Sequence, residues 1–372
     1  MQVYPSTLEG ASRMEKIARS LHPILPVSTT ELVGVHAPGL PTQLEIAPGV
    51  TVNRIPGSNR PGNLGRVLRH VLWQPRVYRH YKKCNVAVVA AHNVWVLPLC
   101  YLISRRASAP LVYNPHELET ETASMRGLKR WAARRIEAHY IRRCAVVSAV
   151  NDLIADWYVK RYDIDRPIPV PNLPEIQSVA TDVRHRLGIP EHAFVFAHTG
   201  HLSEGRNIPA ILDAFKSSPH HVVFFGDGPY RDAVLTARAT SKNIHWHAPV
   251  PADQVVAHFR EADAGLCLVE LAGSLSDQLA TPNKLMEALA ADRPSVCSDF
   301  AEARRWLAPH ADTWIVPRIE NLGAVLDQVG PAEVECFRES HEVPPTWDAV
   351  VAPLAEAYKR LFQATTKKSR HI

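Results

Sequence analysis

Short hydrophobic runs alternate with amphipathic stretches along almost the whole chain. In the first half, the runs predict three strands and the stretches around them predict three helices. The strands are expected at 85–91, 109–115 and 144–150, and the helices at 12–21, 127–143 and 152–162. Strands that alternate with helices form a parallel sheet with helices on both faces, so we predict an α/β fold.

The second half of the chain repeats this alternation. Five further strands are expected at 193–200, 220–228, 243–250, 264–270 and 293–299. Each is followed by a helix-compatible stretch, which predicts a second doubly wound, Rossmann-like sheet. The segment RPIPVPNLPEIQS at 166–178 contains four prolines and therefore suits neither a helix nor a central strand. We place the domain linker there.

The predicted division gives an N-terminal domain at 1–170, a C-terminal domain at 171–345 and a final segment at 346–372. Apolar spacing after Trp347 predicts an amphipathic helix in that segment, which we expect to pack back on the N-terminal domain. Doubly wound sheets bind ligands beyond the carboxyl ends of their strands. A site is therefore expected in a cleft between the two domains.

The composition is that of a soluble globular protein. With 46% hydrophobic and 21% charged residues, the 372-residue chain is neither disordered nor fibrous. Its net charge of +5 suits an anionic small molecule but is too small to imply nucleic acid. The six cysteines form no C-x-x-C pair and are expected to be buried free thiols. No signal peptide or membrane span is visible, so we expect a cytoplasmic protein.

The strongest local feature is TPNKLMEALAADRPSVCSDF at 281–300. Thr281 is a candidate N-cap and Pro282 suits the first helical position, so a helix is expected to begin there. The N–H groups at its start and the Lys284 ammonium would attract a diphosphate, and Glu287 could accept hydrogen bonds from a ribose diol. The alternative, which capping alone favours, is a surface helix with an ordinary exposed Lys and Glu.

Two glycine-containing turns follow strands of the second half. In HTGHLSEGRNIPAILDAF at 198–215, Gly205 permits unusual backbone angles and Arg206 could offer its planar donors to phosphate oxygens. An ordinary strand-to-helix turn would explain the same residues. Gly226 and Gly228 follow the next strand, but they do not complete a G-x-G-x-x-G pattern, so a dinucleotide fingerprint is not expected.

A histidine, His116, follows a predicted strand of the first half, with Glu117, Glu119 and Glu121 behind it. At the carboxyl end of a parallel strand it could act as a polar contact or a proton carrier. A solvated histidine among acids is an equally good explanation. His92 is similarly placed, but a core histidine with satisfied hydrogen bonds explains it better.

Taken in order, these segments resemble a GT-B glycosyltransferase, most closely of family 4 and its bacterial surface-polysaccharide and glycolipid members. The matching pieces, spread over 86–299, are AAHNVW, YNPHELETE, VSAVNDLIADWYVKRY, PVPNLPE, GHLSEGRNIPAILDAF, VVFFGDGP, NIHWHAPVPADQVVAHFREADAGLCLV and TPNKLMEALAADRPSVCSD. The resemblance implies two Rossmann-like domains that face each other across a cleft. It also implies transfer of a sugar from a nucleotide-diphosphate donor to a glycan, a lipid-linked acceptor or a small molecule.

The resemblance also implies residue roles, without a metal ion or other cofactor. Arg206 and Lys284 would hold the diphosphate, Glu287 would bind the ribose, and His116 would lie beside the transferred sugar; His116, Arg206 and Lys284 would be catalytic. The segment around Pro249 and Val250 would line the base. The donor-binding set implied in this way is Gly10, Gly205, Arg206, Pro249, Val250, Thr281, Asn283, Lys284, Leu285 and Glu287.

Three positions depart from the family pattern. Leu279 stands where the first glutamate of Glu-x7-Glu is common, His201 replaces a basic residue, and the loop around Gly10 lacks a glycine pair. Family 4 enzymes retain anomeric configuration by front-face transfer, which needs no protein nucleophile and would tolerate Leu279. Two alternatives stay open: a non-catalytic homologue that acts as a partner subunit, and a nucleotide-sugar epimerase.

The helix predicted at 127–143 carries six Lys or Arg residues. Apolar residues recur at every fourth position from Leu128, beside Trp131. Such a helix can rest on an anionic membrane, which would place the protein at the inner face of the plasma membrane, near lipid-linked acceptors. The alternative is a helix packed on the first sheet with a solvated cationic face.

Overall fold

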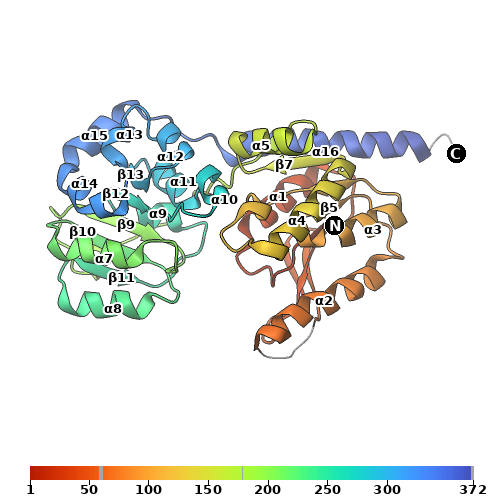
Figure 1. The fold of residues 1–372 in the computed structure, drawn as a ribbon, viewed down its shortest axis with the longest axis horizontal. Coiled ribbons are helices and arrows are strands. Elements are labelled where there is room, and N and C mark those ends of the chain that lie inside the picture. The colour runs from red at the N-terminus through yellow and green to blue at the C-terminus, as the bar shows by residue number, and fades with distance from the viewer. Residues whose placement is uncertain (58–61, 178, 370–372) are drawn as a thin grey trace. The chain divides into compact units, whose positions relative to one another are not determined.

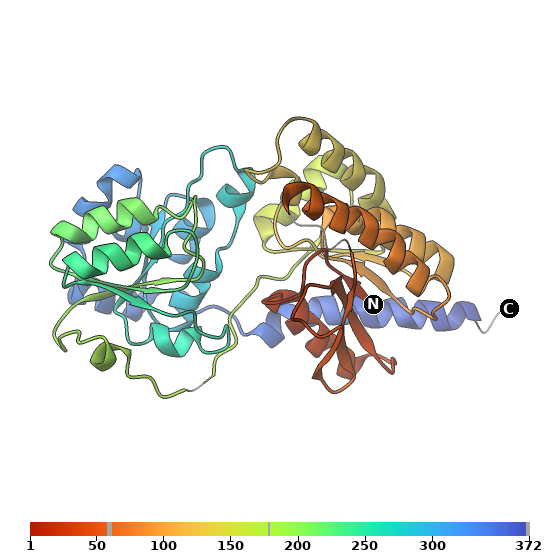
Figure 2. The ribbon, with the colours of Figure 1, turned by 90° about the horizontal axis from the view of Figure 1, so that it is seen from below.

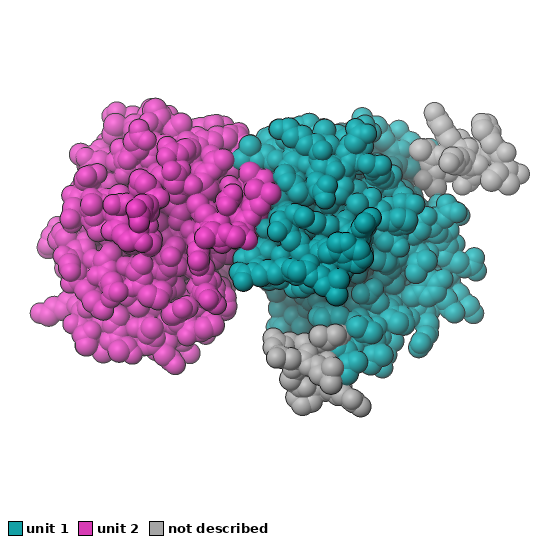
Figure 3. Space-filling view, in the orientation of Figure 1, with its two compact units in different colours: residues 1–171, 348–372 teal, residues 172–347 magenta. Residues whose placement is uncertain are grey.

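The computed structural model describes residues 1–57, 62–177 and 179–369. The chain divides into two compact units, one made of residues 1–171 with 348–372 and the other of residues 172–347 (Figure 3). The division between the first two segments falls after Pro171, inside the proline-rich stretch at 166–178. Each unit is built around one sheet (Figures 1 and 2).

The sheet of the first unit has the strand order β3-β4-β2-β1-β5-β6-β7-β8. Its strands are β1 (Gln2–Val3), β2 (Thr30–Val35), β3 (Gln43–Ala47), β4 (Val50–Ile55), β5 (Val89–Ala91), β6 (Leu111–Tyr113), β7 (Val146–Ala149) and β8 (Ile168–Pro169). The expectation of a purely parallel sheet is wrong at its edge, where β3 pairs antiparallel with β4. A short turn with Gly49 at φ +71° joins these two strands, and only antiparallel neighbours can be joined so tightly.

Helices pack on this sheet (Figure 1). They are α1 (Ser12–Leu21), α2 (Gly62–Tyr81), α3 (Leu97–Ala107), α4 (Gly127–Tyr140), α5 (Asp152–Tyr162) and α16 (Trp347–Ser369), with 3-10 turns η1 (His22–Ile24), η2 (Val94–Val96), η3 (Glu119–Glu121) and η4 (Ile141–Arg143). The C-terminal helix α16 belongs to the first unit although it follows the second in sequence. Its Leu354 and Tyr358 are buried, and the Tyr358 hydroxyl accepts a hydrogen bond from Asn114 Nδ2 at 3.3 Å.

The second unit has a six-stranded sheet in the order β11-β10-β9-β12-β13-β14, in which every described pair of neighbours is parallel. Its strands are β9 (Val195–Thr199), β10 (His221–Phe225), β11 (Ile244–His247), β12 (Ala264–Cys267), β13 (Ser295–Ser298) and β14 (Ile315–Val316). Its helices are α6 (Val183–Arg186), α7 (Ile208–Ser217), α8 (Arg231–Thr240), α9 (Val255–Phe259), α10 (Leu275–Leu279), α11 (Asn283–Ala290), α12 (Ala301–Trp306), α13 (Ala311–Trp314), α14 (Leu322–Gln328) and α15 (Pro331–Ser340), with the 3-10 turn η5 (Ile319–Asn321). The α/β prediction is therefore confirmed in both halves.

The strand order of the second sheet reverses at β9. From β9 the chain first builds outward through β10 and β11, then crosses back and builds through β12, β13 and β14 on the other side. In sheets of this kind the crevice beyond the carboxyl ends of the strands at such a switch point is where ligands bind. A ligand-binding site is therefore expected at the carboxyl end of β9.

The cysteines are not all buried. The thiols are free, and Cys100, Cys267 and Cys297 are buried as expected. For Cys84 and Cys336 the expectation is wrong, because both are exposed. Cys84 follows two lysines beyond the end of α2, and Cys336 lies on the polar side of α15. Among the described residues, no helix is long and apolar enough to cross a membrane.

Candidate functional site

Two consecutive polar residues, His198 and Thr199, end strand β9. His198 is only 1% exposed, and the three residues before it in the strand are buried and apolar. Lys284, in the first turn of α11, places its Nζ 2.7 Å from His198 Nε2. Because an ammonium group can only donate, His198 accepts this hydrogen bond through Nε2 and is neutral.

Positive charge gathers at this end of the sheet. Burial lowers the pKa of Lys284 to about 8, and the charge of neighbouring Arg206 acts in the same direction. No described ion pair or side-chain hydrogen bond involves the Arg206 guanidinium. Within the described parts of the chain, no group of three His, Cys, Asp or Glu side chains is placed to hold a metal. The pair of cations thus favours an anion.

Glu287 lies one turn further along α11. Its Oε2 accepts a hydrogen bond of 2.6 Å from the hydroxyl of Thr199, so the end of β9 orients both the lysine and the glutamate of this helix. The expectation that Thr281 caps the helix is wrong. The N-cap position is Pro282, which gives no side-chain cap, and the Thr281 hydroxyl donates instead to Glu302 at 2.8 Å. Thr281 therefore lies one residue before the N-cap position.

The loop after β9 approaches the loop after β10 very closely. A Cβ added to Gly226 would lie 1.9 Å from the Gly200 carbonyl oxygen, so only glycine fits there. Further along the first loop, Gly205 has φ +77° and its carbonyl accepts a hydrogen bond from the Glu270 amide at 2.9 Å. These contacts fix the backbone of the loop that leads into Arg206.

The remaining residues that the resemblance implies in the second unit differ in accessibility. Pro249 is exposed and Val250 is partly buried, and both follow β11, two strands from β9 at the same sheet edge. The Asn283 side chain accepts a hydrogen bond from Asn172 at 3.2 Å. The Leu285 side chain is fully buried, so it supports the helix from the core.

In the first unit, the residues that follow three neighbouring strands meet at the carboxyl edge of the sheet. The His116 ring stacks on Tyr4, with centroids 4.7 Å apart, and its Nε2 lies 3.0 Å from His92 Nδ1. His92 Nε2 in turn lies 2.8 Å from Gln2 Oε1. Burial lowers the pKa of His116 to about 3, with Arg13 adding to the effect, so this ring is neutral. As expected, His92 is a buried histidine with both nitrogens paired.

Of the three glutamates after His116, Glu117 is exposed, but Glu119 and Glu121 are not part of a solvated acidic run. Glu119 is buried, and its carboxylate accepts a hydrogen bond from the Val94 amide at 2.7 Å. Glu121 is also buried and accepts two hydrogen bonds of 2.7 Å from the guanidinium of Arg134. The acids therefore tie down the loop that carries His116.

Gly10 lies in the loop between β1 and α1 and is exposed. Its φ of +70° is a conformation that glycine adopts readily and other residues rarely do. An added Cβ would have no atom within 4 Å. The backbone angle, and not crowding, thus explains glycine at this position.

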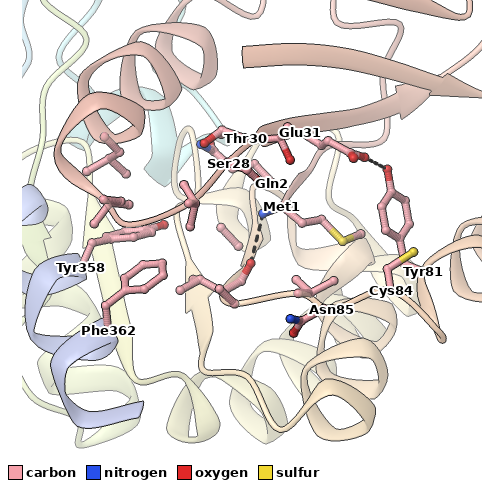
Figure 4. Close-up of a pocket in the computed structure, with 18 of the residues that line it drawn as sticks. Met1, Gln2, Ser28, Thr30, Glu31, Tyr81, Cys84, Asn85, Tyr358 and Phe362 are labelled. Carbon is pink, nitrogen blue, oxygen red and sulfur yellow. Dashed lines mark hydrogen bonds between the residues drawn. The ribbon is translucent and has the colours of Figure 1, made fainter. Parts of the chain in front are cut away.

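A pocket of about 300 Å³ lies at the opposite, amino-terminal edge of the first sheet (Figure 4). Met1 and Thr30, at the starts of β1 and β2, line it together with Glu31 and Tyr81. The Tyr81 hydroxyl donates a hydrogen bond to Glu31. None of the described residues that line this pocket is Lys or Arg, so it lacks the side chains that a diphosphate needs.

Two family models match the chain over most of its length. The model of glycosyltransferase family 4 matches residues 32–172, and the model described as glycosyl transferases group 1 matches residues 194–329. Together the two models assign the chain to the glycosyltransferases. No curated protein matches the sequence of this glycosyltransferase.

Solved structures share its architecture, which is the GT-B fold. Sucrose-phosphate synthase from Thermosynechococcus elongatus matches with a TM-score of 0.73 and 13% identity over 98% of each chain. HepE of Anabaena in complex with UDP-glucose matches with a TM-score of 0.65 and 12% identity over 100% of this chain and 99% of that one. The lipopolysaccharide outer core galactosyltransferase WaaB matches with a TM-score of 0.56 and 14% identity over 98% of each chain. At such identities the likeness shows the fold alone.

Sequence reasoning missed several polar residues of this glycosyltransferase. His198 and Thr199 were not singled out, although a His-Thr pair at the end of an otherwise apolar strand is a readable signal. Tyr4 and Gln2 were missed because β1 has only two residues and shows no periodicity. Both become visible only through their contacts with His116 and His92.

Proposed function

We propose that this glycosyltransferase uses a nucleotide-diphosphate sugar as its donor and binds the nucleotide with its second unit. The observation that carries the proposal is the pair of cations, Arg206 and Lys284, at the switch point of the second sheet. Two positive charges would stabilise a diphosphate, and most strongly when it leaves with its full charge. The solved structures of HepE with UDP-glucose and with UDP support this choice.

Each residue then has one role. Arg206 and Lys284 neutralise the diphosphate, assisted by the uncapped amides at the start of α11. Glu287, oriented by the Thr199 hydroxyl, accepts hydrogen bonds from the ribose diol. The segment at Pro249 and Val250 lies beside the base. His116 contacts the transferred sugar.

The proposed reaction is a front-face transfer with retention of anomeric configuration. The acceptor hydroxyl attacks the anomeric carbon on the face from which the diphosphate departs. The bond between that carbon and the phosphate oxygen breaks, and the leaving oxygen takes the acceptor proton. The products are a glycoside and a nucleoside diphosphate. No protein nucleophile is needed, in keeping with Leu279 at the end of α10.

We further propose that the reaction is independent of a metal ion, because side-chain cations supply the charge that a divalent ion would give. Activity that persists in excess EDTA is the expected result. Activity that is lost in EDTA and restored by Mg²⁺ or Mn²⁺ would contradict this part of the proposal. Product anomers, assigned by NMR from an α-linked donor, test retention separately.

Nucleotide binding by the purified full chain is the direct test. A bound ligand raises thermal stability by mass action, so a thermal-shift screen of nucleoside diphosphates and their sugars should yield one preferred base. Lys284→Ala should abolish the shift. Lys216→Ala is the matched control, because Lys216 is exposed on α7 of the same unit and forms its described ion pair with Asp213. An equal shift in all three proteins would overturn the assigned site.

Products distinguish the proposed transfer from the two alternatives. Glycoside formation with release of the nucleoside diphosphate supports transfer. Conversion of the donor sugar into its epimer without an acceptor would identify an epimerase. No nucleotide binding and no turnover would identify a non-catalytic partner subunit.

We also propose that the acceptor is presented at an anionic membrane surface, which α4 would contact at its inner, cytoplasmic face. Ala133 and Glu137 form the buried face of this helix, whereas Leu128 is 78% exposed and Trp131 56% exposed. Trp131 lines a hollow of about 430 Å³ together with Arg130, Arg134, Arg135 and Arg161. Exposed apolar side chains beside arginines suit an anionic membrane, because the apolar groups can insert between lipids while the arginines bind the head groups.

A further inference from the structure

A chain of hydrogen bonds behind His116 determines which of its nitrogens carries the hydrogen. Gln2 in β1 is 4% exposed and His92, directly after β5, is 0% exposed. Gln2 Oε1 lies 2.8 Å from His92 Nε2, and His92 Nδ1 lies 3.0 Å from His116 Nε2. The three residues belong to neighbouring strands or to the turns that follow them, so the sheet itself sets their spacing.

The direction of the chain follows from its first member. An amide oxygen only accepts, so His92 Nε2 carries a hydrogen and donates it to Gln2. Burial holds the pKa of His92 well below its ordinary value, and His116 and Arg13 add to the effect, so His92 is neutral with one hydrogen. Its Nδ1 must then accept, and the hydrogen between the two rings comes from His116 Nε2.

We propose that Gln2 and His92 are positioning residues that hold His116 in the Nε2–H tautomer, with Nδ1 as a hydrogen-bond acceptor for a hydroxyl of the transferred sugar. No hydrogen bond of the described residues uses His116 Nδ1. The stacked ring of Tyr4 holds the imidazole plane, so the lone pair of Nδ1 has a fixed direction. The role toward the sugar rests on the proposed function, whereas the tautomer does not.

This arrangement decides between the two roles that sequence position leaves open for His116. A proton carrier must exchange a proton near neutral pH, but the Nε2 hydrogen is held by His92 and the ring stays neutral. A fixed acceptor instead selects a partner that can donate, so the site would discriminate a sugar hydroxyl from fluorine or hydrogen at the same carbon.

The tautomer can be measured on the unliganded full chain by two-bond ¹H–¹⁵N correlation NMR of the histidine rings, with His116→Gln used for assignment. The expected wild-type pattern is an unprotonated Nδ1 and a protonated Nε2 at His116 across neutral pH. Gln2→Leu removes the amide acceptor at nearly the same volume, so His116 should become a mixture of tautomers. His245→Gln is the control, because it breaks a similar histidine pair, with His221 at 3.0 Å, in the other unit.

Kinetics test the role toward the sugar. Loss of one neutral hydrogen bond in Gln2→Leu should lower kcat/KM by about three- to tenfold. With a donor that carries fluorine in place of the contacted hydroxyl, wild type and Gln2→Leu should be equally slow, which a merely structural role of Gln2 would not produce. Thermal denaturation of Gln2→Leu checks that the variant is folded.

The outcomes separate the two hypotheses. A wild-type His116 protonated at Nδ1, or a pattern that Gln2→Leu leaves unchanged, would overturn the positioning role whether or not the protein transfers sugar. The stated tautomer together with no nucleotide-sugar binding would remove the proposed function and with it the sugar contact. The substitution Gln2→Leu could instead lower kcat/KM by the same factor with every deoxy-fluoro donor as with the natural donor. In that case the acceptor role of Nδ1 would be wrong.

Discussion

Lys284 Nζ donates a hydrogen bond of 2.7 Å to His198 Nε2, a neutral imidazole, and no described carboxylate forms an ion pair with this ammonium. A carboxylate partner would cancel the charge, whereas an imidazole orients the ammonium and leaves its charge available. Burial makes that charge costly in the free protein, and this is why the pKa of Lys284 falls to about 8. An anion that binds here offsets part of the free-energy cost of the buried ammonium.

The first prediction concerns pH. Lys284 is protonated below its pKa of about 8 and loses its charge above it, so the affinity for a nucleoside diphosphate should fall as pH rises through that value. Titration calorimetry between about pH 7 and 9.5, above the phosphate pKa, measures the effect. In Lys284→Arg the decrease should disappear, because a guanidinium stays charged. A wild-type affinity independent of pH would contradict the site.

The second prediction concerns His198. His198→Leu removes the acceptor of the Lys284 ammonium, and loss of a hydrogen bond to a charged group should weaken nucleotide binding by about ten- to a hundredfold. His198→Gln keeps an acceptor oxygen and should retain most of the affinity. Titration calorimetry of nucleotide binding to both variants separates the loss of the hydrogen bond that orients Lys284 from a change in packing around residue 198. If the Gln variant were as weak as the Leu variant, the hydrogen bond would not be the cause.

The helices that the sequence predicts best are those whose ends are marked locally. Helix α5 has the expected bounds because Asn151 caps it, accepting a hydrogen bond from the Ile154 amide at 2.9 Å, and Asp163 ends it in a left-handed conformation. The start of α11 is marked less clearly, because its N-cap is Pro282 and not Thr281, although Lys284 and Glu287 fall near the start of the helix as the sequence predicts. Strands β2 and β4, with six residues each, escape prediction because Glu31 interrupts the first run and Asn53 and Arg54 interrupt the second.

The rest of the site depends on contacts between distant parts of the chain. His198 is 86 residues from Lys284, and Gln2 is 90 residues from His92. Hydrophobic periodicity assigns a residue to an element but does not say which elements become neighbours. The strand order β1-β5-β6 brings Gln2, His92 and His116 together, and this order follows from the tertiary packing of the whole unit.

A third prediction concerns Glu287 and its partner. Glu287→Gln should weaken binding of the nucleoside diphosphate that the thermal-shift screen selects by about tenfold, because a charged hydrogen bond to the ribose diol is lost. The same substitution should have little effect on the 2′-deoxy form of that nucleotide, which lacks one of the hydroxyls. Thr199→Val removes only the hydroxyl that orients the carboxylate, so it should weaken nucleotide binding by a smaller factor than Glu287→Gln does. Equal losses for both nucleotides would mean that Glu287 does not contact the ribose.

A fourth prediction concerns the stability of the first unit. Glu137 is fully buried and accepts hydrogen bonds from the hydroxyls of Tyr113, Tyr158 and Tyr162 at 2.7–3.2 Å. Glu137→Ala leaves a cavity and three unpaired hydroxyls, so the free energy of unfolding should fall by about 3–5 kcal/mol. Urea unfolding followed by circular dichroism measures it. The exposed Glu356 serves as the control, because its substitution by Ala should leave the free energy of unfolding nearly unchanged.

The last prediction separates a membrane-binding α4 from a merely cationic one. Flotation with vesicles that contain phosphatidylglycerol should carry the wild-type protein at low salt and release much of it at high salt, because surface charges are screened. Trp131→Ala removes an exposed aromatic side chain without changing charge, and Arg135→Glu reverses one charge of the hollow; each should reduce flotation. Arg318→Glu, an exposed charge reversal in the second unit, should not. If it reduced flotation as much as Arg135→Glu, net charge and not α4 would explain the binding.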